Sequence, residues 1–303
     1  MSAPAKFTSL ENNVRDDSGW ALISVLWVVS ILAMMAAATQ MLTVTSYRIE
    51  AHAIERAQIG AALDGAVVRA VLGVADARIE QRWRVDGAPQ TFSFGGYTMR
   101  VAVQDERGRY DLNLVDDVSL RQLLRDAGTE GPTTDILADR ILDWRTRSDS
   151  SLSRLHGATD ADYAAAGLPW HPRHAPFQSV EELQMVLGIT PAIYARLRPA
   201  LTVYTHQPSI DPEVAPRQAL VALFAGDTGK ADALMQLRNS PSGDQGEPGP
   251  SSRPGLLNPQ MPLVGQPFEI HAEMAIGHAH YERVAVIELT GDINRPYLIL
   301  NWK

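Results

Sequence analysis

The chain opens with a long apolar segment, and no charged residue occurs from Trp20 to Tyr47. A helix rises about 1.5 Å per residue, so about twenty of these residues would cross a hydrocarbon core of ~30 Å. No turn signal follows the apolar run, and the helical pattern continues into charged sequence at Arg48. We therefore expect a transmembrane helix over residues 20–45 that continues into a longer amphipathic helix.

The amphipathic continuation is expected over residues 48–85. Apolar or small residues recur every three or four positions, at Ile49, Ala53, Ala57, Gly60, Leu63, Val67, Val71 and Val74. Val68 and Leu72 begin a second, adjoining stripe. This pattern indicates a helix with one face against a folded domain. Gly87 and Pro89 are expected to end it.

A hairpin and a mainly helical block follow. Gly95 and Gly96 separate two strand-like runs, the second of which alternates from Tyr97 to Gln104. Within residues 105–200 the pattern predicts helices at 118–127, 133–144, 160–166, 180–187 and 192–197. Asp117 and Ser179 are expected N-caps.

The rest of the chain mixes short helices and strands. Helices are expected at 217–224 and 230–237, and strands at 201–204, 268–274, 283–290 and 297–302. Residues 239–255 contain no apolar side chain and are rich in Pro, Gly and Ser, which predicts a flexible linker.

This order predicts an α+β fold: a long N-terminal helix, an antiparallel sheet, and an all-α domain inserted into the sheet domain. The expected parts are a leader (1–19), the transmembrane helix (20–45), the long helix and hairpin (46–104), the inserted helical domain (105–200) and the remainder of the sheet domain (201–303).

Composition narrows the function classes. The 303-residue chain has a net charge of −8, whereas a general nucleic-acid surface would be basic. Residues 179–201 have a helix-hairpin-helix-like pattern, but Thr190 stands where nucleic-acid-binding versions carry a second Gly. The absence of cysteine excludes disulfides and thiolate chemistry. No catalytic grouping stands out, so we expect neither an enzyme nor a nucleic-acid partner.

Three interpretations of the apolar N-terminus compete. A secretory signal peptide would start with a basic region and be cut after its apolar core. Residues 1–18 are instead slightly acidic, and the apolar run is longer than a typical signal core. An ordinary signal anchor would keep the whole segment. The third possibility is cleavage before the apolar run, between Gly19 and Trp20.

Specific sequence features support the third interpretation. Gly19, Trp20 and the charge-free helix resemble the leader and start of type IV pilins and type II secretion pseudopilins. Most members have Glu at the fifth mature position, where this chain has Ser24. That departure, with the start WALISVLWVVSIL, resembles minor pseudopilin K of type II secretion systems. Further matches to that subunit are GRYDLNLVD (108–116), ILDWR (141–145), and the long stretches 163–190 and 194–205.

The resemblance implies a specific place in the cell. A prepilin peptidase would cut after Gly19 and methylate Trp20. The helix would lie in the inner membrane, with the remaining chain in the periplasm as part of a pseudopilus that exports folded proteins. The implied partners are minor pseudopilins I and J.

The helix is the expected interface with these partners. Its candidate contact residues are Ser24, Ile49, Ala53, Leu63 and Val67. Because Ser24 is neutral, it cannot pair with the N-terminal ammonium of an adjacent subunit as the family Glu does. Together with the bulk of residues 105–200, this favours a position at the pseudopilus tip.

The resemblance also implies a possible calcium site in the helical domain. Calcium prefers six to eight oxygen ligands, and Asp143, Asp160 and Asp162 are the candidates. The family segment resembles D-W-x-D-x-D, but its two later acidic positions are Thr146 and Ser148 here. A solvated acidic loop without metal is an equally good interpretation.

Two other functions remain open at this stage. One is a membrane-anchored periplasmic enzyme or ligand-binding domain with an ordinary signal anchor. The other is a minor type IV pilin, although such pilins usually keep the missing Glu. The N-terminal sequence of the membrane-extracted protein would distinguish the ordinary anchor from a pseudopilin, because only the pseudopilin begins at Trp20.

Overall fold

The structure is a computed structural model that describes residues 18–76, 78, 81–147, 154–239, 264–292 and 294–303. The side chains of residues 18, 19, 21 and 39–51 are outside this description. The expected leader up to residue 17, and the expected linker from residue 240 onward, also lie outside the described residues. The chain divides into two compact units, residues 1–60 and residues 61–303.

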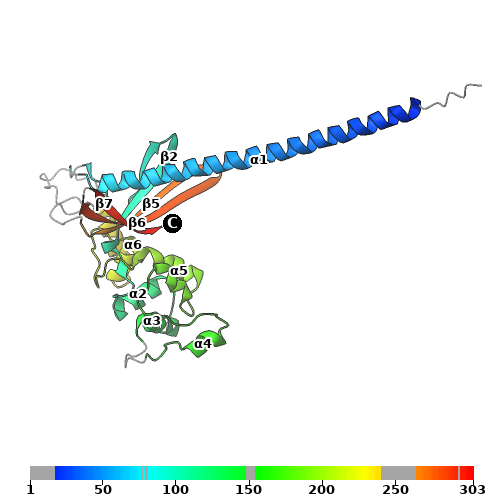
Figure 1. Cartoon of the computed structure of the whole chain (residues 1–303). Helices are drawn as coiled ribbons and strands as arrows, with labels where there is room; N and C mark the ends of the chain where they lie inside the picture. The colour runs from blue at the N-terminus through cyan, green and yellow to red at the C-terminus, as the bar shows by residue number, and fades with distance from the viewer. Residues whose placement is uncertain (1–17, 77, 79–80, 148–153, 240–263, 293) are drawn as a thin grey trace, which may run out of the picture. The chain divides into compact units, whose positions relative to one another are not determined.

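A single helix, α1 (Ser18–Val74), runs from the first unit into the second (Figure 1). This continuous helix was predicted, but it ends about eleven residues earlier than the pattern suggested. After Val74 the chain turns back, and the Trp83 backbone N–H donates to the Gly73 carbonyl at 3.0 Å. The Trp83 ring then covers Gly73, where an added Cβ would lie 2.5 Å from the ring. A tertiary contact therefore ends the helix before Gly87 is reached.

The second unit contains a five-stranded antiparallel sheet in the order β1-β2-β5-β6-β7. Its strands are β1 (Gln90–Phe94), β2 (Tyr97–Asp105), β5 (Pro267–Ile276), β6 (Ala279–Asp292) and β7 (Arg295–Trp302). The predicted hairpin is confirmed, with Gly95 and Gly96 at positive φ in the turn. β2 pairs directly with β5, so that Asp105 faces Phe268 although the intervening chain is long.

One face of this sheet is apolar because alternate residues of neighbouring strands point the same way. Met99 pairs with Met274 and Val101 pairs with Ala272, and all four side chains are buried. The part of α1 within the second unit packs near this sheet, since Asp64 accepts from Arg283 Nε at 2.9 Å. This helix-on-sheet layer forms one of two cores in the second unit.

The other core is helical. Most of its elements lie, in sequence, between two short strands that pair in parallel, β3 (Tyr110–Asp111) and β4 (Leu201–Thr202). We call this pair of strands the neck. Its elements are α2 (Asp117–Asp126), α3 (Pro132–Arg145), α4 (Asp160–Ala165), η3 (Val180–Met185), α5 (Pro191–Leu197) and η4 (Arg198–Ala200). We call residues 112–200 the helical segment.

The helical core is larger than the expected 105–200 domain. Two later helices, α6 (Arg217–Leu223) and α7 (Thr228–Asn239), contribute Leu220 and Ala231 to the same buried cluster. The sequence analysis had assigned residues 201–239 to the sheet domain. The structure shows instead that helices of this stretch pack in the helical core.

Local sequence explains most helix starts. Asp116 caps α2 by accepting from the Ser119 backbone N–H at 2.9 Å, one residue before the expected cap. Thr190 caps α5 in the same way, followed by Pro191 at the first helical position. The expected α-helix at 180–187 is a 3₁₀ helix instead, and Ser179 makes no side-chain capping bond. Its tighter winding is common in short connecting pieces.

Candidate functional site

The second-unit part of α1 has a buried face and an exposed face. The buried side chains are Ala62, Leu63, Ala66, Val67, Ala70, Val71 and Val74. Leu63 is 3% exposed and Val67 is 0% exposed. Both residues had been expected to contact neighbouring pseudopilin helices, and that assignment is wrong because the chain's own fold covers them.

The exposed face carries a different apolar stripe. Ala61, Gly65, Val68 and Leu72 follow one another at spacings of four, three and four residues, with Leu72 61% exposed. We call these four residues the outer seam. These spacings average about 3.7 residues, close to the 3.6-residue turn of a helix, so the four residues stay on one face of α1. A solvent-facing stripe would normally be polar, so this uncharged seam indicates a protein contact.

Two charged residues, Asp64 and Arg69, flank the seam, and each contacts another side chain of the protein. Asp64 pairs with Arg283, whose guanidinium lies over the Trp302 ring at 5.4 Å. On the other flank, Arg69 lies over the Trp83 ring at 5.5 Å. These contacts hold the helix at a fixed rotation on the sheet, so the seam faces outward.

The remaining interface candidates lie in the first unit. Ser24 and Ala53 are exposed on α1, whereas the side chain of Ile49 is outside the described residues. The stretch Leu22–Ala38 is helical and apolar, and the described side chains within it are exposed. By length and composition one described stretch qualifies as a membrane span, His52–Val74, but half of its window is buried in the protein. Trp20 is exposed, and the Gly19 backbone is helical.

The calcium candidates do not converge. Asp162 forms a capping box with Thr159, accepting from its backbone N–H at 2.7 Å and its hydroxyl at 2.8 Å. These hydrogen bonds lower the pKa of Asp162. Asp160 is exposed in the same helical turn, and Asp143 lies near Gly157. Among the described residues no three His, Asp or Glu side chains form a group suited to a metal, so these three do not fit calcium.

Two of the matched motifs instead serve the helical core. Arg145 of ILDWR donates to the Leu112 carbonyl at 2.5 Å and to the Val115 carbonyl at 2.7 Å. Asn113 of GRYDLNLVD binds both the backbone N–H and the carbonyl of Phe177, at 2.7 and 3.0 Å. Backbone groups buried away from water need such partners. The motifs therefore tie together segments that are distant in sequence.

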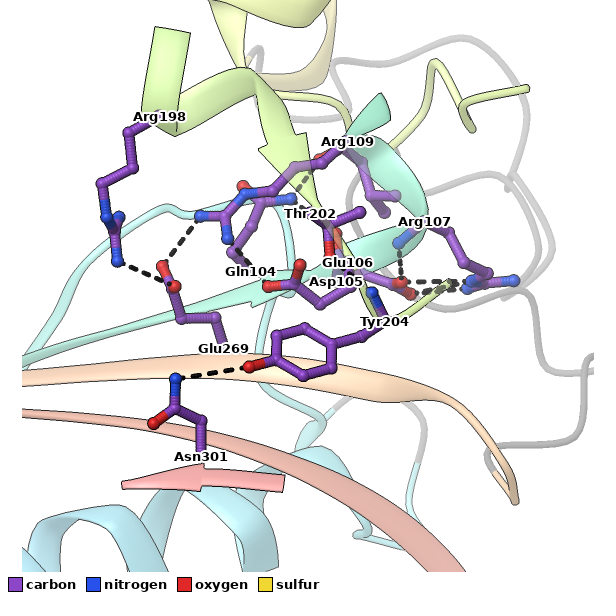
Figure 2. Close-up of polar contacts among 11 residues, drawn as sticks. Gln104, Asp105, Glu106, Arg107, Arg109, Arg198, Thr202, Tyr204, Glu269 and Asn301 are labelled. Carbon is purple, nitrogen blue, oxygen red and sulfur yellow. Dashed lines mark hydrogen bonds and ion pairs between the residues drawn. The ribbon is translucent and has the colours of Figure 1, made fainter. Parts of the chain in front are cut away.

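A buried ionic cluster lies beside the neck, and sequence reasoning missed it. Figure 2 shows Glu106, Arg109, Arg198 and Glu269 pointing toward one another, and we call these four residues the neck cluster. Arg109 donates through Nη1 to Glu106 and through Nη2 to Glu269, both at 2.8 Å. Arg198 of η4 donates to the second oxygen of Glu269 at 3.2 Å. The cluster thus links the helical segment to the sheet.

The two carboxyl groups have opposite pKa shifts although they share Arg109. Burial raises the pKa of Glu106 to about 7, against the attraction of Arg109 and a hydrogen bond from Thr202. Burial also opposes ionisation of Glu269, but Arg109 and Arg198 outweigh it and hold that pKa at about 2. The difference follows from the number of cations, because Glu269 contacts two arginines and Glu106 contacts one.

The neck is also packed closely through its backbone. An added Cβ on Gly108 would lie 2.6 Å from the Val214 carbonyl oxygen, so only Gly fits there. Close by, the Asp211 backbone N–H donates to the Arg107 carbonyl at 2.7 Å. A run of charges directly after a buried strand, as in DERGR (105–109), is the one sequence signal that could have indicated this cluster.

Comparison with known proteins finds a match to this part of the molecule. The family model for protein K of the type II secretion system matches residues 103–206, which begin at the end of β2 and finish just after β4. Curated relatives carry the same name. The chain is therefore similar to protein K of the type II secretion system.

The similarity to these relatives is low in sequence but extends over much of the chain. Protein K of Pseudomonas aeruginosa is 28% identical over 246 residues, covering 74% of this chain and 73% of that protein. Protein K of Klebsiella pneumoniae is 25% identical over 307 residues, covering 90% of this chain and 93% of that protein. A chain in the crystal structure of the GspK-GspI-GspJ complex from enterotoxigenic Escherichia coli has the same fold. It superposes with a TM-score of 0.58 at 16% identity, covering 84% of this chain and 98% of that chain.

Proposed function

We propose that this protein is the minor pseudopilin K of a type II secretion system and assembles with pseudopilins I and J at the pseudopilus tip. Similarity to protein K of the type II secretion system supports the pseudopilin role. The fold is shared with a protein whose crystal structure is of a GspK-GspI-GspJ complex, which supports these two partners. The observation that carries the proposal is the outer seam, an uncharged stripe that is exposed at Ala61, Val68 and Leu72, whereas Gly65 lies against the Phe94 ring of β1.

The N-terminal part has a second role in this proposal. Prepilin peptidase cuts after Gly19, the apolar helix stays in the inner membrane, and residues 46–303 lie in the periplasm. The exposed apolar side chains of Leu22–Ala38 support a lipid or helix environment for this segment. Residues 112–200 form an inserted helical domain in the same proposal, because the sheet strands before and after them pair directly.

The seam can be tested by placing a charge on it. Leu72→Glu in the full-length chain should reduce co-purification with pseudopilins I and J by about tenfold or more, because the carboxylate would be desolvated without a partner. Stability should change by less than ~0.5 kcal/mol, since position 72 is exposed. Val118→Glu is the matched control, as Val118 is 75% exposed on α2.

Equal recovery of the partners with Leu72→Glu and Val118→Glu would exclude the seam as their contact. Loss of partner binding in both variants would mean that the effect is not specific to the seam. Only a selective loss with Leu72→Glu supports the proposal.

Processing can be tested at Gly19. A peptidase that acts at the membrane surface needs close access to the backbone, which Gly permits because it has no side chain. Gly19→Leu should leave the precursor uncut, and the intact mass should include residues 1–19. Normal maturation of this variant would contradict the leader assignment and favour an ordinary signal anchor. A substitution at Ser18 should not have this effect.

A further inference from the structure

The oxygen atoms around Asp143 are already engaged in hydrogen bonds within the protein. The Asp143 carbonyl accepts from the Thr146 backbone N–H at 3.0 Å, and the Trp144 carbonyl accepts from the Ala175 backbone N–H at 3.1 Å. The Thr146 hydroxyl donates to the Leu142 carbonyl at 2.5 Å. Calcium needs six to eight oxygen ligands, so a calcium ion beside Asp143 would have to replace or share these contacts.

Arginines on and after α3 also place positive charge among the calcium candidates. Hydrogen bonds from Thr159 lower the pKa of Asp162, and the nearby charge of Arg140 lowers it further. Burial lowers the pKa of Arg145, and the nearby charge of Arg154 adds to this effect. A calcium ion in this region would therefore be repelled by guanidinium groups as well as attracted by carboxylates.

Arg145 itself joins parts of the helical segment that are distant in sequence. From the end of α3 it donates to the Leu112 carbonyl at 2.5 Å and to the Val115 carbonyl at 2.7 Å, both of which precede α2. The charges of Asp111 and Asp116 favour its ionised form. A guanidinium presents several donors in one rigid plane, so a single arginine can hold two carbonyls at once. A bound metal ion has the same effect on a fold, because it draws oxygens from separate parts of the chain to one point.

We propose that arginine takes the structural part expected of calcium in this chain, so that the helical segment folds and stays folded without a divalent ion. Arg145 carries this role. The inference concerns the stability of the helical segment and is independent of the proposed function. It also gives a reason for Thr146 at a position that is acidic in the D-W-x-D-x-D segment, because no divalent ion has to be neutralised there.

Thermal unfolding of the full-length, detergent-solubilised protein tests this proposal. Trp144 packs against Tyr163 and Phe177, so near-ultraviolet circular dichroism reports on the helical core. The unfolding midpoint should differ by less than about 1 °C between calcium chloride and EGTA, whereas a calcium site filled at 100 times its dissociation constant would raise it by roughly 5–10 °C. Magnesium chloride at the same concentration controls for ionic strength. A rise in calcium that magnesium does not reproduce would overturn the proposal.

The role of Arg145 is tested by removing its charge and donors. Arg145→Met should lower the midpoint by roughly 4–8 °C, equally in calcium chloride and in EGTA, because two carbonyls of buried residues lose a charged donor. Arg125→Met is the matched control, since Arg125 is exposed on α2 and donates to Gln122 at 2.9 Å. Its midpoint should fall by less than ~2 °C.

Equal losses for Arg145→Met and Arg125→Met would contradict the structural role of Arg145. If Arg145→Met does not fold, Arg145→Lys keeps the positive charge without the planar fork and should show a smaller loss than Met, again independent of calcium. The comparison of calcium chloride with EGTA uses the unmodified protein, so it remains decisive whatever the variants do.

Discussion

Replacing Arg109 with Met should destabilise the protein by about 3–5 kcal/mol, the range found when one partner of a buried ion pair is removed. Arg109 contacts both Glu106 and Glu269 and is 8% exposed. Met has a similar length but no charge, so the variant would leave two buried carboxyl groups without their shared cation. Urea unfolding of the detergent-solubilised chain, monitored by near-ultraviolet circular dichroism, would measure the loss.

The control for this variant is an exposed pair on the same sheet. Arg100 donates to Glu273 at 2.9 Å, and its side chain is 60% exposed. Exposed pairs contribute at most about 1 kcal/mol, so Arg100→Met should have a small effect. Similar losses for Arg109→Met and Arg100→Met would show that the neck cluster is not energetically distinct from a surface pair.

Leu63→Ala should cost about 2–4 kcal/mol, whereas Leu72→Ala should change stability by less than ~0.5 kcal/mol. The two residues are on the same helix, but Leu63 is 3% exposed and Leu72 is 61% exposed. Truncating Leu63 leaves a cavity between α1 and the sheet, whereas truncating Leu72 removes a side chain that already faces outward.

The comparison of the two variants has its own internal control, since each loses the same atoms from the same residue type. Partner binding should show the reverse order, with Leu72→Ala more affected than Leu63→Ala in any variant that remains folded. A large loss of stability for Leu72→Ala would mean that the outer seam packs within the chain.

Regular elements were predicted well where the sequence signal is local. The Gly95-Gly96 turn and the alternation from Tyr97 to Gln104 predicted the β1–β2 hairpin, and the structure confirms it. Pro191 indicated the start of α5, and Gly188 the end of the helical stretch before it, in the same way. These signals act through the backbone of a few neighbouring residues, so they do not depend on the rest of the fold.

The orientation of α1 could not be predicted, because both of its stripes are apolar. Leu63 and Val67 belong to one stripe, and Val68 and Leu72 to the other. Hydrophobic periodicity gives the angle between such stripes but does not say which one meets the sheet. That choice depends on Asp64 and Trp83, whose partners are set by tertiary contacts.

The neck cluster could not be predicted from the sequence for a related reason. Its arginines and carboxylates are distant in sequence, with Arg109 and Glu269 separated by most of the second unit. Charged residues are rarely buried, so Glu106 and Arg109 resemble an ordinary polar turn in the sequence. For Asp143, Asp160 and Asp162 the error was the reverse. Their proximity in sequence suggested a metal-binding group, and the described residues do not form one.

The direct pairing of Asp105 with Phe268 has a consequence for how this architecture varies. To the sheet, everything between β2 and β5 is a single hairpin connection, however long it is. The free-energy cost of closing a longer loop grows only logarithmically with its length. The helices between these strands therefore behave as a cassette: they can be enlarged, shortened or exchanged without changing the strand order or register of the sheet that carries them.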